Sequence, residues 1–116
     1  MIVRTKRVYE PKARSDGRRI LIDRLWPRGV SKATAGIHFW AKDVAPSHKL
    51  RRWYQHVPEK WPEFRRRYFA ELDGNPAGVA ALRRQLGRGV VTLVFGSKET
   101  RLNNASAMRD YLKARA

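Results

Sequence analysis

One stretch, ILIDRLWPRGVSK at residues 20–32, decides how this chain folds. Its first three residues, Ile20 to Ile22, are apolar and mostly β-branched, which is typical of a buried strand. Asp23 and Arg24 follow directly, and the Trp-Pro-Arg-Gly sequence at 26–29 then forces a turn. A buried strand that ends in charged side chains indicates the wall of a site. The stretch therefore predicts both a sheet and a place where ligands bind.

Three more segments predict strands. Residues 2–9 contain β-branched residues in partial alternation, and residues 90–95 form a continuous apolar run, as in a strand covered on both faces. Residues 37–41 fit either a third strand or an extended core segment. Together with the strand at 19–22, these segments supply a small sheet.

Apolar spacings of three and four predict helices between the strands. Residues 59–72 carry aromatic and aliphatic side chains at this spacing, and Ser47 is a suitable N-cap for a helix over 48–55. Pro76 suits a first turn and Gly87 a helix end. The expected helices cover a short turn within 31–36, then 48–55, 59–72, 76–86 and a last segment that begins near Asn103 or Asn104.

Strands separated by helices favour one α/β domain, residues 1–116, with a small, mostly parallel sheet and helices on both faces. In such sheets ligands bind beyond the carboxyl ends of the strands. Asp23, Asp43 and Lys98 follow three of the expected strands, and the helices beginning at Ser47 and Asn103 would start at the same edge. This edge is expected to be polar, cationic and suited to an anion.

The composition limits the classes of function. With 26 Lys and Arg against 10 Asp and Glu, the formal charge is +16, which attracts polyanions and anionic ligands. The chain has no cysteine, which excludes a disulfide framework, a thiolate nucleophile and a sulfur-ligated metal. Met1-Ile2-Val3-Arg4 lacks the apolar segment of a signal peptide, and no apolar run is long enough to span a membrane. A cytoplasmic location is expected.

Several segments carry a resemblance to a known family. The strings are DGRRILIDRLWPRGVSK, WAKDVAPSHKLRRWYQH, FRRRYFAEL and VTLVFGSKETRLNNA. Together they resemble the YeaO-like family, the domain of unknown function numbered 488, from about Val3 to the last helix. The resemblance implies a small bacterial α/β domain without an established activity. Where that family usually reads Asn-His-Ala, this chain reads Asn103-Asn104-Ala105, so the imidazole is absent.

Asp23 and Asp43 are the candidate catalytic carboxylates. Asp23 beside Arg24 fits either a catalytic acid next to an anion-binding guanidinium or a structural ion pair that fixes the loop. Arg28 and Lys32 fit anion contacts or ordinary surface charge, and Trp26 fits a stacking platform or a core side chain. The candidate ligand-binding residues are Arg24, Trp26, Arg28, Lys32, Ser47, Lys98 and Asn103.

Two other patterns carry weaker signals. Gly96-Ser97-Lys98 after a strand is similar to part of a phosphate cradle, but the full GxxxxGK[ST] pattern is absent. Ser47, His48, Asp43 and His56 include the residue types of nucleophilic catalysis without forming a known motif. The histidines at 38, 48 and 56 lack metal-ligand spacing, so neither a metal nor a cofactor is expected.

Three functions stay open. The first is binding of a phosphate- or carboxylate-bearing ligand at the strand ends, with an enzymatic role undecided. The second is nucleic-acid binding, because Arg51, Arg52 and the arginines at 65–67 lie beside aromatic residues. An amphipathic helix with a solvated arginine face would give the same pattern. The third is a protein-binding or accessory domain without a site.

Asp23 also carries a specific structural expectation. A carboxylate at the end of a buried strand loses solvation and needs partners. Asp23 is therefore expected to be largely buried and paired with a guanidinium or with backbone amides of the 26–29 turn. Arg24 points the other way by strand alternation, so its partner is expected elsewhere, at Asp43 or a bound anion.

Overall fold

In the computed structural model, which describes residues 1–115, the strands form one parallel sheet of order β1-β4-β2-β3. β4 (Val90–Phe95) is last in the chain but lies between β1 (Ile2–Arg7) and β2 (Arg18–Leu21), and the two-residue β3 (Phe39–Trp40) extends the other edge. The prediction of an α/β fold with a parallel sheet is confirmed. Residues 37–41 contain both an extended segment and a short strand.

β4 is covered on both faces, which explains its continuous apolar sequence. Val91, Leu93 and Phe95 join the main hydrophobic core, whereas Val94 belongs to a smaller cluster on the other face. Thr92 also faces away from the main core, and its hydroxyl donates to the Asp16 carbonyl. The alternation follows from the two-residue period of a strand.

The helices begin and end close to the expected residues. The helix expected over 48–55 ends at Tyr54, because Gln55 adopts the left-handed conformation. The helix expected over 59–72 runs from Trp61 to Asp73, because Pro58–Lys60 forms a 3-10 turn ahead of it. Side-chain oxygens of Ser31, Ser47 and Asn103 cap three helices by accepting backbone N–H groups. The helices are α1 (Lys32–Ala35), α2 (His48–Tyr54), α3 (Trp61–Asp73), α4 (Pro76–Leu86) and α5 (Asn104–Ala114).

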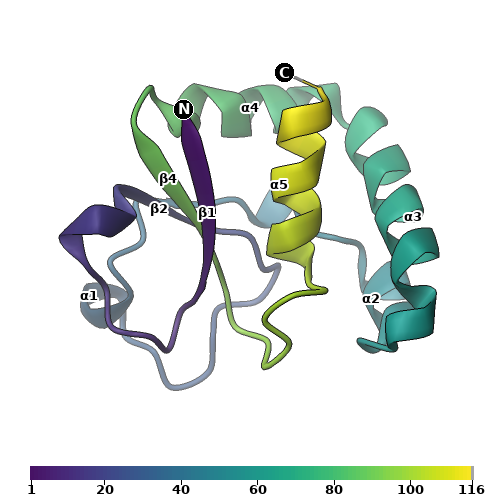
Figure 1. The fold of residues 1–116 in the computed structure, drawn as a ribbon, viewed down its shortest axis with the longest axis horizontal. Helices are drawn as coiled ribbons and strands as arrows, with labels where there is room; N and C mark the ends of the chain where they lie inside the picture. Colours follow the sequence, from purple (N-terminus) through teal and green to yellow (C-terminus); the bar gives the residue numbers. More distant parts are fainter. Residues whose placement is uncertain (116) are drawn as a thin grey trace.

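The two faces of the sheet are covered unequally. The main core is built by the sheet with α2, α3, α4 and α5, and α3 and α5 lie side by side in Figure 1. The other face is covered by residues 26–37, which include the single-turn α1 and pack on Val8 and Val94. Helices therefore lie on both faces, as expected, but the second face has only one turn of helix.

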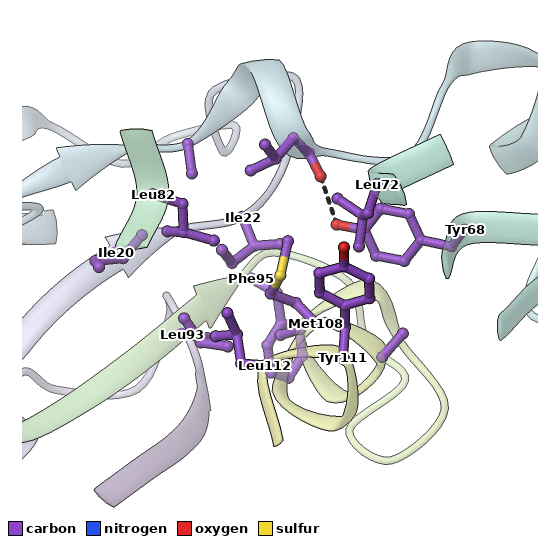
Figure 2. Packing of buried hydrophobic residues seen from close by; sticks show 14 of the residues in the cluster. Ile20, Ile22, Tyr68, Leu72, Leu82, Leu93, Phe95, Met108, Tyr111 and Leu112 are labelled. Atoms are coloured by element: carbon purple, nitrogen blue, oxygen red, sulfur yellow. Dashed lines mark hydrogen bonds between the residues drawn. The ribbon is translucent and has the colours of Figure 1, made fainter. Parts of the chain in front are cut away.

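Tyr68 of α3 fixes the segment that leads into α2. Its side chain is fully buried in the main core, and its hydroxyl donates to the carbonyl of Val44 (Figure 2). Burial of this phenol raises its pKa well above its usual value. Because the Val44 carbonyl is held from the core side, residues 44–47 keep a fixed path between β3 and α2.

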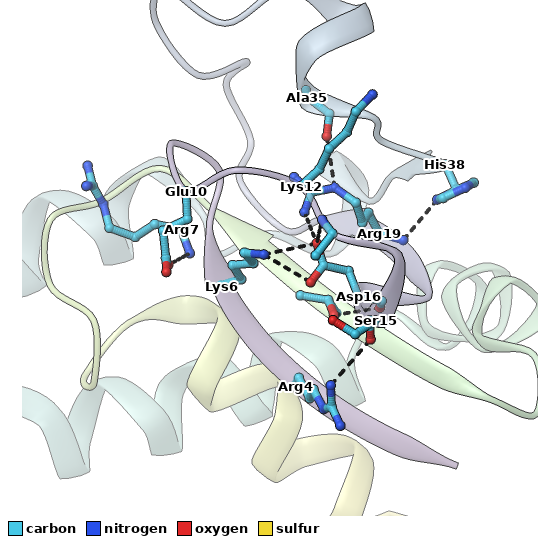
Figure 3. Close-up of polar contacts among 12 residues, drawn as sticks. Arg4, Lys6, Arg7, Glu10, Lys12, Ser15, Asp16, Arg19, Ala35 and His38 are labelled. Atoms are coloured by element: carbon cyan, nitrogen blue, oxygen red, sulfur yellow. Dashed lines mark hydrogen bonds and ion pairs between the residues drawn. The ribbon is translucent and has the colours of Figure 1, made fainter.

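A buried ion network secures the first strands (Figure 3). The Asp16 carboxylate accepts from the Lys6 ammonium at 3.1 Å and the Arg19 guanidinium at 2.6 Å, and it also accepts the Ala13 backbone N–H. Arg19, only 3% exposed, donates in addition to the Ala35 carbonyl at the end of α1. Burial acts to raise the pKa of Asp16, but these hydrogen bonds outweigh it and lower the pKa below its usual value.

We predict that Asp16→Asn lowers the free energy of unfolding by about 3–5 kcal/mol, because it leaves the buried Arg19 guanidinium without its counter-charge. Urea denaturation at pH 7 measures this loss. A carboxyl with a depressed folded-state pKa stabilises above its unfolded pKa, and this stability disappears as the pH falls through the folded value. The wild type should therefore lose more stability in acid than the variant does.

The control is Glu63→Gln, which removes an exposed carboxylate from the pairs with Arg66 and Arg67. Exposed ion pairs contribute little, so this variant should unfold close to the wild type. If both variants lost the same free energy of unfolding, the buried network would stabilise the fold no more than an exposed ion pair does.

Candidate functional site

A cavity of about 640 Å³ opens at the carboxyl ends of β2 and β4. Its walls come from the turn after β1, the loop after β2, α2 with the residues on either side of it, α3, the loop after β4, and the first residue of α5. It is lined by Tyr9, Asp23, Leu25, Pro27, Arg28, Pro46, His48, Arg51, Arg52, Tyr54, Gln55, His56, Phe64, Gly96, Ser97 and Asn104.

Asp23 is the one carboxylate among these lining residues, and it is held from two sides. One oxygen accepts the backbone N–H of Gly96 at 2.7 Å, and the other accepts the Asn104 side-chain amide at 3.0 Å. A Cβ added at Gly96 would lie 3.2 Å from the carboxylate, so glycine permits this close approach. Trp40 donates its indole N–H to the Asp23 carbonyl at 2.7 Å.

These contacts correct the partners expected for Asp23. The residue is half-buried and paired, but its partners are an amide from the loop after β4 and an amide from α5. Neither a guanidinium nor the 26–29 turn contributes a hydrogen bond to it within the residues that the structure describes. The Asp23 carboxylate therefore accepts hydrogen bonds from amides of two other elements rather than from the adjacent turn.

The pKa of Asp23 lies above its usual value. Burial is the largest influence and raises it, since desolvation disfavours the charged form. The hydrogen bonds from Asn104 and Gly96, and the positive charges of Arg51 and His56, lower it only in part. The cavity therefore holds a carboxyl group that binds its proton more tightly than a solvated aspartate does.

Another part of the cavity lining is cationic. α2 contributes His48, Arg51 and Arg52, and Arg28 comes from the loop after β2. No ion pair involves Arg28, Arg51 or Arg52 among residues 1–115, whereas arginines of α3 pair with Glu63 and Asp110. The cavity thus concentrates guanidinium groups that lack protein counter-ions.

The turn after α2 has an unusual backbone. Gln55 (φ 46°) and His56 (φ 57°) both adopt the left-handed conformation, and they are the non-glycine residues with positive φ in the part of the chain described here. Such conformations cost about 1–3 kcal/mol each and are retained where the surroundings enforce them. Here the Val57 N–H donates to the Tyr54 carbonyl, and the Tyr54 hydroxyl donates to the Leu102 carbonyl. The strained turn places both residues in the cavity wall.

Of the candidate catalytic and ligand-binding residues, Asp23 and Arg28 line the cavity. Arg24 instead donates to the carbonyls of Ala45 and Pro46, so its partner is neither Asp43 nor another carboxylate. Trp26 packs in the smaller hydrophobic cluster and donates its indole N–H to the Val30 carbonyl. Both side chains therefore hold the loops that shape the cavity.

The remaining candidates lie outside the cavity lining. Ser47 and Asn103 cap α2 and α5, and Ser47 also donates its hydroxyl to Glu71. Lys32, Asp43 and Lys98 are exposed on α1, on the segment before α2 and on the loop after β4. A catalytic role for Asp43 and a ligand-binding role for the other four stay predictions.

The structure also brings in residues that the sequence reasoning did not select as a site. His48, Arg51 and Arg52 share one face of α2 through their three- and four-residue spacing, and His56 follows in the strained turn. Their helical spacing in the sequence could have indicated a shared cationic face, but a solvated helix face has the same pattern. Asn104 was noticed only as a departure from the resembled family.

Comparison with known proteins places this fold in a family. The model of the "Inactive DUF488-N3 subclade" matches residues 2–116. The chain belongs to the DUF488 family. This membership confirms the resemblance drawn from the motifs.

Similar curated proteins come from mycobacteria and from Escherichia coli. Uncharacterized proteins of Mycobacterium bovis and Mycobacterium tuberculosis are 43% identical over 113 residues, covering 97% of this chain and 95% of theirs. Uncharacterized protein YeaO of Escherichia coli is 36% identical over 114 residues, covering 98% and 99%. No solved structure shows a significant match.

Two general features complete the description of residues 1–115. None of their helices has the length and apolar character needed to cross a membrane. They contain no group of three or more His, Asp or Glu side chains placed to hold a metal ion.

We predict that Asn104→Ala raises the pKa of Asp23 further, because the variant removes a hydrogen bond to the charged form. The Asp23 carboxyl carbon, followed by NMR through a pH titration, reports this change. A folded-state pKa above the unfolded value means that stability present at low pH is lost as the pH rises through the folded pKa. That loss should therefore extend to higher pH in the variant.

Asn75→Ala is the control, since Asn75 caps α4 and donates to the Asp43 carbonyl, away from Asp23. It should leave the titration of Asp23 unchanged. An Asp23 midpoint that stays the same in Asn104→Ala would mean that the amide does not stabilise the carboxylate.

Proposed function

We propose that this domain binds a small ligand bearing a phosphate or carboxylate group in the cavity at the carboxyl ends of the strands. The observation that carries the proposal is the set of guanidinium groups from Arg28, Arg51 and Arg52, which line one cavity without forming ion pairs in residues 1–115. His48 and His56 add further donors. A volume of about 640 Å³ lies within the range of small-molecule sites.

Binding is favoured over catalysis. The matching family model is described as inactive, which supports a domain that keeps a pocket without turnover. Both oxygens of Asp23 already accept internal hydrogen bonds, which restrains the carboxyl group. Its raised pKa is the feature that a general acid or base would need, and it supports the enzymatic alternative.

A cytoplasmic location remains part of the proposal.

The nucleic-acid alternative rests mainly on the formal charge of +16. The arginines of α3 support it less than their number suggests. Arg66 and Arg67 pair with Glu63, and these hydrogen bonds lower the pKa of Glu63 to about 2. Arg65 pairs with Asp110. The arginines of α3 therefore offer less unpaired charge to a polyanion than the sequence suggests.

We predict that the wild type binds inorganic phosphate and citrate, and that replacing Arg51 and Arg52 together by Ala weakens this binding at least about tenfold. Hydrogen bonds to charged groups contribute about 1.5–3 kcal/mol, which corresponds to this loss. Isothermal titration calorimetry at low ionic strength gives the affinities, and backbone amide shifts of Gly96 and Ser97 report whether the anion enters the cavity.

The matched control replaces Arg84 and Arg88 by Ala, which removes the same charge from residues outside the cavity lining. It should bind both anions as the wild type does. The proposal fails if neither anion binds the wild type, or if the two double variants lose affinity equally, which would indicate attraction to net charge alone.

A further inference from the structure

We propose that the cavity recognises the phosphate monoester of a pentose, with Arg51 and Arg52 holding the phosphate and Asp23 accepting hydroxyl groups of the sugar. This inference rests on the proposed function and narrows its ligand. The cavity contains a carboxylate, Asp23, among its arginines, and a site for a simple anion would not need one.

The charge of the lining favours a dianion. Three guanidinium groups, from Arg28, Arg51 and Arg52, face a single carboxyl, and the two imidazoles add no negative charge. A monoanion would leave most of this positive charge unbalanced. The forked donors of arginine also match the oxygens of a phosphate, which accept two parallel hydrogen bonds. A phosphate monoester supplies both the charge and the geometry.

Asp23 sets a second requirement on the ligand. Each of its oxygens accepts one internal hydrogen bond, from Gly96 or from Asn104. An ionised carboxylate has about four acceptor positions, so each oxygen retains one for the ligand. These positions repel a bare anion and accept an O–H group. The ligand therefore carries hydroxyl donors a short distance from its phosphate, as a pentose phosphate does.

The size and the rim of the cavity fit an organic body larger than a phosphate ion. Leu25 and Tyr9 line it while remaining 59% and 47% exposed, and Pro27 and Pro46 add apolar surface. The Tyr9 hydroxyl donates to the Arg28 carbonyl at 2.9 Å, which ties this rim to the cationic loop. Two ligands share the required chemistry: a free pentose phosphate, and a nucleoside monophosphate whose base lies against Leu25.

Calorimetric titrations at pH 7.5 and low ionic strength test this inference with ribose 5-phosphate, adenosine 5′-monophosphate, ribose and inorganic phosphate. At least one of the two phosphate esters should bind about tenfold more tightly than inorganic phosphate, because its hydroxyls add charge-assisted hydrogen bonds. Ribose alone should not bind detectably. If the base lies on this rim, Leu25→Ala should weaken the binding of adenosine 5′-monophosphate and leave the affinity for ribose 5-phosphate unchanged.

The variant Asp23→Asn keeps the side-chain shape but removes the charged acceptor. It should lose the advantage of the preferred ester over inorganic phosphate and retain affinity for inorganic phosphate itself. Thermal denaturation shows whether the variant is folded; if it is not, the ligand series on the wild type decides alone.

The outcomes separate the two proposals. If inorganic phosphate binds the wild type as tightly as both esters, or if Asp23→Asn preserves the preference for the ester, the pentose inference is wrong while the anion site stands. If none of the phosphate compounds nor citrate binds, the proposed function itself is wrong.

Discussion

The carboxylate of Asp23, held between the Gly96 amide and the Asn104 side chain, is the interaction on which the arrangement of the site depends. It joins the end of β2 to the loop after β4 and to the start of α5. The same residue's carbonyl accepts from Trp40, the last residue of β3. Four elements that lie far apart in the chain therefore meet at one residue. Removing a carboxylate from water is costly, and the amides offset this cost only in part, as its raised pKa shows.

The arginines that line the cavity also carry an electrostatic cost. Arg51 and Arg52 of α2 line the same cavity as Arg28, none of the three forms an ion pair within the described residues, and like charges gathered around one cavity repel each other. The left-handed Gln55 and His56 add backbone strain directly after α2. The arginines of α3 show that the chain can neutralise such groups, since Glu63 and Asp110 pair with them. A bound anion would compensate the unpaired charge of this lining.

The elements of this fold were predictable because their signals are local. The alternating and continuous apolar runs at β1, β2 and β4 give the sheet, and cap residues such as Ser47 and Asn103 give the helix starts. The location of Asp23 at a strand end was equally local. Its partners were not, because Gly96 and Asn104 lie more than seventy residues away in sequence.

The cavity wall was missed for a related reason. On sequence alone, Arg51 and Arg52 are indistinguishable from the solvated arginines of α3, and only the packing of α2 beside the strand ends makes them different. The pairing of Arg24 with Asp43 was wrong because alternation gives the direction of a side chain but not what lies there. The carbonyls of Ala45 and Pro46 occupy that place.

Two aspartates flank β2, and the contrast between them separates structure from function. Asp16, ahead of the strand, accepts from Lys6 and Arg19, and these partners lower its pKa. Asp23, after the strand, accepts only from amides in the described residues, and its pKa is raised. The charge of Asp16 is balanced within the protein by its ion pairs with Lys6 and Arg19. Asp23 forms no ion pair within the described residues, and each of its oxygens accepts one hydrogen bond, so it is the carboxyl whose hydrogen bonding the proposed ligand would complete.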